Sequence, residues 1–180
     1  ILSDEFLADV RALPQKNIAV LLLERLLKGK VKSIQRMNVV QAKKYSEMLK
    51  NSIDKYNKRS IQTSKVIEEL IEIAKEMRKA AERGEDLGLS QDEVAFYDAL
   101  ADHMTAKEVL GDDTLRAIAH ELTKVIKENM TIDWNRKESA RAKMRITVRR
   151  LLREYGYPPD LAKLAVETVV RQAELMAGNI

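Results

Sequence analysis

The sequence predicts an all-α fold, a multi-helix bundle of long amphipathic helices with no sheet. Its composition favours this class, because 45% of the 180 residues are hydrophobic and 33% are charged, while only six are Gly and three are Pro. A second observation is the absence of Gly and Pro between Gly29 and Gly84, where apolar residues recur at helical spacing. No segment alternates strictly between apolar and polar residues, as a half-buried strand would.

The first half of the chain opens with short and then long helical patterns. A short first helix, which Ser3 or Asp4 can cap, precedes a second helix that begins at Pro14 and ends at Gly29. Two apolar faces at helical spacing follow, separated by the polar run 56–60. This run allows either a hairpin turn or one continuous helix, and we favour two helices. The first face contains Ile34, Ala42, Tyr45, Leu49, Ile53 and Tyr56, and the second contains Val66, Ile67, Leu70, Ile71, Ala74, Met77 and Ala81.

Further helices begin after residue 89, and several have recognisable ends. Ser90 and Glu93 have the spacing of a capping box, in which each side chain accepts from the other residue's backbone N–H. A short helix stops at Gly111, and we expect Asp112 or Asp113 to cap the next helix. After another turn, a long basic helix leads to a proline-containing connection and a last helix.

Two glycines mark the best candidate for a boundary within the chain. Gly84 and Gly88 bracket acidic residues just before the capping box. We therefore expect a helical subdomain with long helices at residues 1–84, a linker at residues 85–89 and a C-terminal helical subdomain at residues 90–180.

Composition also limits the kinds of site and surroundings that we expect. The chain has no Cys, which excludes disulfides and thiolate metal sites. Its longest apolar run, residues 18–23, is far shorter than the ~20 residues of a membrane-spanning helix. We expect a cytoplasmic protein without membrane contact. Because the first residue is not Met, we also expect the chain to be part of a longer protein.

The net charge of +4 conceals three strongly charged segments. Residues 28–59 contain ten bases and two acids, a net charge of +8. Residues 68–113 contain five bases and fourteen acids, a net charge of −9, and residues 134–153 contain eight bases and one acid, a net charge of +7. Such segments either attract one another within the fold or present charged faces to partners.

The sequence contains no recognisable catalytic motif. There is no phosphate-binding glycine loop, GxSxG nucleophile elbow or HExxH zinc motif. His103 and His120 lie on separate predicted helices, and neither has Glu three residues earlier, as bundle di-metal sites do. The four glutamates of residues 68–76 are better explained as a solvated helix face than as a cation site. We therefore expect no catalytic, cofactor-binding or metal-ligating residue, and no cofactor, in this chain.

The long basic helix is the most informative segment. Its apolar stripe consists of Ala140, Met144, Val148, Leu151 and Tyr155, and its other side carries Lys143, Arg145, Arg149, Arg150 and Arg153. Five cations on one exposed arc repel one another, so an acidic partner would explain their clustering. That partner would offer phosphates or a carboxylate-rich protein face. Pairing with the acidic segment 68–113 is an alternative of equal weight.

Trp134 lies at the start of this segment. A tryptophan in such a position most often anchors a core against the neighbouring helix, and anchoring an interface is the alternative. Together with the five cations it makes up the candidate partner-binding residues. If the chain instead contacts DNA, the candidates are Lys43, Lys44 and Lys50 of the first basic segment.

Several stretches resemble one known family over nearly the whole chain. They are residues 13–17, 66–71 and 89–100, then Asn129-Met130-Thr131-Ile132-Asp133-Trp134, and finally Tyr155-Gly156-Tyr157-Pro158-Pro159. The Thr-Ile-Asp-Trp stretch, followed by a basic helix and Tyr-Gly-Tyr-Pro-Pro, is a specific combination. The chain resembles the C-terminal helical region of the restriction (R, motor/endonuclease) subunit of type I restriction–modification enzymes.

The resemblance implies a place within a DNA-cleaving enzyme. In that family the full-length R subunit has a nuclease domain and two motor lobes, and uses ATP and Mg to translocate and cleave DNA. Its C-terminal helical region is associated with attachment to the methyltransferase core of modification and specificity subunits. No nuclease or motor motif occurs in this chain, so the resemblance implies assembly rather than catalysis by this part.

Three hypotheses follow from the residues and the resemblance. The leading one is a docking domain that attaches the ATP-dependent DNA translocase and endonuclease to the methyltransferase core. The alternative is a DNA-contacting helical module beside the motor. An independent enzyme is the third, and ATP hydrolysis or DNA cleavage by the isolated chain would support it.

Overall fold

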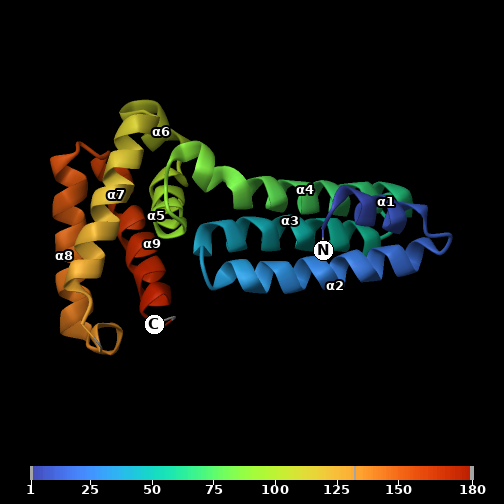
Figure 1. Ribbon diagram of the computed structural model, residues 1–180, viewed down its shortest axis with the longest axis horizontal. Helices are drawn as coiled ribbons and strands as arrows, with labels where there is room; N and C mark the ends of the chain where they lie inside the picture. The colour runs from blue at the N-terminus through green and yellow to red at the C-terminus, as the bar shows by residue number, and fades with distance from the viewer. Residues whose placement is uncertain (1, 132, 179–180) are drawn as a thin grey trace. The chain divides into compact units, whose positions relative to one another are not determined.

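The computed structural model describes residues 2–131 and 133–178, and they form helices joined by short turns (Figure 1). The helices are α1 (Asp4–Ala12), α2 (Lys16–Gln35), α3 (Val39–Asn57), α4 (Thr63–Leu87), α5 (Gln91–Ala101), α6 (Met104–Leu110), α7 (Asp112–Asn129), the 3₁₀ helix η1 (Trp134–Arg136), α8 (Glu138–Glu154) and α9 (Pro159–Gly178). The described residues contain no strand, which confirms the all-α prediction.

The chain divides into two compact units. Unit 1 comprises Ile1–Gln35 and Gln41–Arg83, and unit 2 comprises Arg36–Val40 and Gly84–Ile180. The division after residue 83 falls inside α4, which continues to Leu87, so residues 85–87 of the expected linker are helical. The helix ends where Gly88 adopts a positive φ of 66°, a conformation that glycine adopts without a steric penalty.

Unit 1 is built on three long helices and the shorter α1. Its core is aliphatic and contains Leu7, Val20, Leu23, Leu27, Leu49, Val66, Leu70, Ile71 and Met77. Two ion pairs tie α1 to α4: Arg11 contacts Glu68 at 2.7 Å, and Arg78 contacts Asp4 at 2.8 Å.

The preference for two helices on either side of residues 56–60 is confirmed. α3 ends at Asn57, and α4 begins only at Thr63. Arg59, in the turn, has a φ of 52°, and its N–H donates to the carbonyl of Tyr56. The polar run cannot bury a stripe, so the chain reverses there and the two apolar faces meet in one core.

The predicted bounds of the second helix are wrong at both ends. α2 begins at Lys16, not Pro14, and continues through Gly29 to Gln35. A glycine inside a helix costs about 1 kcal/mol relative to alanine, which packing can offset. Beyond Gly29 the apolar residues Val31 and Ile34 still pack in the core of unit 1, so the helix continues past the glycine.

Unit 2 surrounds α5, in which every residue from Val94 to Leu100 is buried. The core side chains of unit 2 include Phe96, Leu100, Leu115, Leu122, Trp134, Leu152 and Val166, which come from five elements. Contacts of α5 with α7 and α9, and of α8 with α9, make up most of the packing. A helix buried on all sides explains why α5 lacks a clear polar face in the sequence.

A polar network holds the segment Arg36–Val40 within unit 2. The amide of Gln172, a side chain only 1% exposed, accepts from the Val39 N–H at 3.0 Å and donates to the Met37 carbonyl at 2.7 Å. Asn38 donates to the buried carboxylate of Asp98 at 2.7 Å. Burying these groups is tolerable because they satisfy one another.

The helix ends test two capping predictions. The capping box is confirmed, since the Ser90 N–H donates to Glu93 Oε2 at 2.9 Å and the Glu93 N–H donates to Ser90 Oγ at 3.3 Å. The prediction that Asp112 or Asp113 caps α7 is wrong, because Gly111 occupies the N-cap. Both aspartates lie in the first turn, where the helix dipole favours negative charge.

The stretch Tyr155-Gly156-Tyr157-Pro158-Pro159 is the turn between α8 and α9. Gly156 has a φ of 74° and its N–H donates to the Arg153 carbonyl, while the Tyr157 N–H donates to the Leu152 carbonyl. This pair of bonds is a Schellman motif, which satisfies carbonyls at the end of a helix. Pro159 then occupies the first position of α9, where a proline loses no hydrogen bond.

Candidate partner-binding surface

Helix α8 presents one apolar face to the core of unit 2 and one polar face to solvent. Met144, Val148, Leu151 and Leu152 are buried. Their spacing of three and four residues places them on a single side of the helix. The cations predicted to bind a partner therefore lie on the flanks or on the outer side, and the two positions differ in their contacts.

Arg145 lies on the flank that faces α9 and is already ion-paired. Its guanidinium contacts Glu138 at 3.2 Å and Glu167 at 3.1 Å, and its side chain is 28% exposed. Arg141 extends the same network to Glu138 and to Glu174 of α9. The hydrogen bond from Arg141, more than the one from Arg145, lowers the pKa of the Glu138 carboxyl. Arg145 therefore contributes to α8–α9 packing, whatever else it binds.

The other four cations form the outer side of α8. Lys143, Arg149 and Arg153 are exposed, and none of them has a carboxylate partner in the described part of the chain. Arg150 lies 3.9 Å from Glu154, and both side chains are largely exposed. We call Lys143, Arg149, Arg150 and Arg153 the α8 basic face. Ile146, which does not fit the apolar stripe predicted from the sequence, lies among them and is 65% exposed.

The part of the acidic segment 68–113 that lies in unit 2, residues 84–113, does not neutralise this face. Among the described residues of unit 2, no ion pair joins residues 134–153 to residues 84–113 of the segment. Its acids pair with bases elsewhere: Glu68 with Arg11, Glu69 with Lys55, Glu76 with Lys44, Asp92 with Lys127, Glu93 with His120, and Asp112 with Arg116. The alternative of pairing with the acidic segment 68–113 is thus wrong for residues 84–113, the part of that segment in unit 2.

Trp134 lies in the core of unit 2. It belongs to η1, and its side chain is 1% exposed among the apolar side chains of that core. Its indole N–H finds no acceptor among the described residues. Ile132, which precedes it in the Thr-Ile-Asp-Trp stretch, lies outside those residues. The burial of Trp134 supports its interpretation as a core anchor, and a partner contact through its ring remains a prediction.

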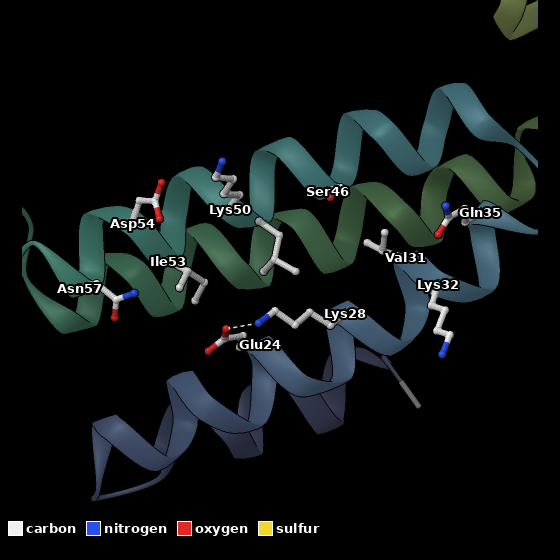
Figure 2. Close-up of a pocket in the computed structure, with 11 residues that line it drawn as sticks. Glu24, Lys28, Val31, Lys32, Gln35, Ser46, Lys50, Ile53, Asp54 and Asn57 are labelled. Carbon is white, nitrogen blue, oxygen red and sulfur yellow. Dashed lines mark hydrogen bonds and ion pairs between the residues drawn. The ribbon is translucent and has the colours of Figure 1, made fainter. Parts of the chain in front are cut away.

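The lysines considered for DNA contact lie on α3. Lys43 and Lys50 are exposed, and no described carboxylate pairs with either of them. Lys44 contacts Glu76 at 3.5 Å. Lys50 also lines an open groove of about 610 Å³ within unit 1, to which α2 contributes Lys28 and Lys32 (Figure 2).

The groove has a mixed character. Val31, Leu49 and Ile53 form its apolar part, and Lys28 is ion-paired with Glu24 at 2.6 Å (Figure 2). Asp54 adds a second acid to the lining. Three lysines against two acids leave a net charge of +1 (3 − 2), a weak attraction for a polyanion.

Of the two histidines, His120 takes part in a local side-chain contact. His120 Nδ1 lies 2.6 Å from Glu93 Oε1. Burial acts to raise the pKa of the Glu93 carboxyl, but the hydrogen bonds from Ser90 and His120 outweigh it, so the pKa lies below its ordinary value. Within residues 2–131 and 133–178, no three His, Cys, Asp or Glu side chains gather to hold a metal ion. None of the helices there is long and apolar enough to cross a membrane.

The fold and this surface define an all-α domain of two helical units in which a basic helix faces solvent. The chain belongs to the family described as "Type I restriction enzyme HindI endonuclease subunit-like, C-terminal", which matches residues 1–179. This membership confirms the resemblance stated from the sequence.

Two relatives show where the chain belongs in longer proteins. It is 36% identical over its full 180 residues to the type I restriction enzyme HindI endonuclease subunit of Haemophilus influenzae, of which it covers 17%. Over 160 residues, 87% of the chain, it is 34% identical to a Methanocaldococcus jannaschii protein provisionally named type I restriction enzyme MjaIXP endonuclease subunit, of which it covers 15%. The chain thus spans about a sixth of these relatives. No solved structure matches it.

Proposed function

We propose that the chain is the C-terminal docking domain of a type I restriction enzyme R subunit. In this proposal it attaches the ATP-dependent DNA translocase and endonuclease to the methyltransferase core of modification and specificity subunits. ATP and Mg would bind to other parts of the subunit. Family membership supports the setting, and the α8 basic face supports a contact with an acidic partner.

The observation that carries the proposal is the exposure of Lys143, Arg149 and Arg153 together with their lack of ion-pair partners in the described chain. Like charges three and four residues apart on a helix destabilise it by about 0.2–0.5 kcal/mol per pair. The fold gains nothing from gathering these charges, whereas a partner with carboxylates gains ion pairs and faster association.

Co-purification of the chain with its cognate methyltransferase core tests the proposal. The variant Lys143→Glu/Arg149→Glu/Arg153→Glu reverses three unpaired charges, and we expect it to lose the complex while keeping its helical circular dichroism. Arg145 is left unchanged because its reversal would break the ion pairs to Glu138 and Glu167.

The matched control is Lys163→Glu/Arg171→Glu, which reverses two exposed, unpaired cations on α9 of the same unit. We expect this control to bind the core as the unmodified chain does. Equal recovery of the core by the triple variant and the unmodified chain would contradict the proposed role of the α8 basic face.

Contact with DNA is the second candidate, and the exposed, unpaired Lys43 and Lys50 favour it. If these lysines and Lys44 neutralise three phosphates, the logarithm of the binding constant falls with the logarithm of salt with a slope of about −2.7. We expect Lys43→Gln/Lys44→Gln/Lys50→Gln to flatten this slope. If the unmodified chain fails to bind duplex DNA at low salt, this candidate is excluded.

A further inference from the structure

An exposed isoleucine lies at the centre of the α8 basic face. Ile146 is 65% exposed, although isoleucine is among the residue types most often fully buried. On a helix its nearest neighbours are three and four residues away, so Lys143, Arg149 and Arg150 surround it. Ala142, also exposed, lies one turn before it and offers little steric hindrance.

We infer that this face binds a protein surface in which carboxylates surround an apolar pocket, and that Ile146 enters the pocket. The inference rests on the proposed docking function and assigns the partner surface to the methyltransferase core. An apolar side chain at the centre of a ring of charged residues matches the anatomy of protein–protein hot spots, whose surrounding contacts exclude water.

The alternative occupant, a nucleic acid backbone, suits the cations but not the isoleucine. A phosphodiester backbone offers charged and hydroxyl-bearing groups, and protein contacts to it come mainly from basic and hydrogen-bonding groups. An isoleucine between the cations would face phosphates without gaining an apolar contact. A carboxylate-rich protein surface satisfies both features, because arginine pairs with carboxylates in a bidentate manner and apolar side chains supply a pocket.

The charges near Ile146 determine which sign of charge the partner surface must carry. Glu154 lies 3.9 Å from Arg150, so the four cations and this acid together carry a net charge of +3 (4 − 1). A neutral or basic protein surface would leave Lys143, Arg149 and Arg153 desolvated without partners, which is unfavourable. The partner must therefore be acidic around its pocket.

The test measures the affinity of the chain for the cognate methyltransferase core and, separately, for a duplex DNA. We expect Ile146→Ala to weaken binding to the core about tenfold, the effect of losing about 1.4 kcal/mol of apolar contact. Ile146→Asp should weaken it about a hundredfold, because it adds a charge that faces carboxylates. Val109→Ala, which truncates a side chain on α6 that is 63% exposed, is the matched control and should bind like the unmodified chain.

The possible outcomes distinguish a failure of this inference from a failure of the docking proposal. If the unmodified chain binds the core and Ile146→Ala binds equally well, the apolar anchor is refuted and the docking proposal stands. If the unmodified chain does not bind the core, both fail. If the chain binds duplex DNA, Ile146→Ala keeps that affinity and DNA displaces the core, the face is a nucleic acid site and the inference is wrong.

Discussion

Replacing Tyr157 with phenylalanine removes a single hydroxyl from the turn between α8 and α9. Tyr157 is 3% exposed, and its O–H donates to the carbonyl of Leu100 at 2.7 Å. Leu100 is the penultimate residue of α5, and the carbonyls of a helix's last turn lack a partner within the helix. Because the carbonyl is buried, losing the donor costs about 1–2 kcal/mol at neutral pH.

The same hydroxyl makes this cost depend on pH. Burial, and then the charge of Asp102, raises the pKa of Tyr157 to about 12 in the folded protein, from 10.0. The folded state therefore retains its proton where the unfolded state has lost it, so the stability from Tyr157 is complete below pH 10 and declines between pH 10 and pH 12. At pH 11 the free energy of unfolding of the unmodified chain is therefore lower by about 1.4 kcal/mol than at neutral pH. The Phe variant lacks this decrease because it has no hydroxyl at this position.

Urea unfolding at pH 7 and pH 11 measures both effects. The fluorescence of Trp134, the single tryptophan of the chain, reports the unfolding of unit 2. We expect Tyr157→Phe to be less stable at pH 7 and about as stable as the unmodified chain at pH 11. Tyr155→Phe, which changes a neighbouring tyrosine that is more exposed, is the control. A stability difference that is the same at both pH values would refute the reasoning.

Three further substitutions test the described contacts by the same unfolding assay. Gln172→Ala leaves the Val39 N–H and the Met37 carbonyl without their described partner and should cost about 2 kcal/mol; a loss below about 0.5 kcal/mol would show that water replaces the amide. Gly156→Ala should cost about 1–2 kcal/mol because φ is 74°, although no atom obstructs the added methyl; an unchanged midpoint would refute strain as the cause. Arg149→Gln removes like-charge contacts with Arg145 and Arg153 and should leave stability equal or raise it by about 0.5 kcal/mol, and a clear loss would show that the fold needs this cation.

Much of the fold could be predicted from patterns that act locally. The capping box at Ser90 requires only a serine and a glutamate at the correct spacing, and the hairpin after Asn57 follows from a polar run between two apolar stripes. The end of α2 could not be predicted, because the packing of Ile34 outweighs the local preference of Gly29. The inclusion of Arg36–Val40 in unit 2 depends on Gln172, more than a hundred residues away, and no local pattern signals it.

The candidate surface was predictable in its charge but not in its detail. The sequence places both Lys143 and Arg145 outside the apolar stripe of a helix, but only the structure shows that acids on α8 and α9 pair with Arg145 while Lys143 lacks a described partner. Ile146 could not be predicted as part of this surface, because helical spacing identifies apolar residues that belong to a stripe and Ile146 falls outside it. A single exposed apolar residue is ordinary on a protein surface, so it is the cations around Ile146 that distinguish this residue.

The residues that identify the family and those proposed to bind a partner are different sets. Trp134, Gly156 and Tyr157 belong to the recognisable stretches, and the structure gives each a role in folding: a core side chain, a helix end and a buried hydroxyl. These roles explain their identity without any partner. The fold makes no comparable demand at Ile146 or Arg149, which face solvent, so a glutamine would serve packing equally well at either. Function in this chain is therefore to be sought at the exposed positions that folding leaves unexplained.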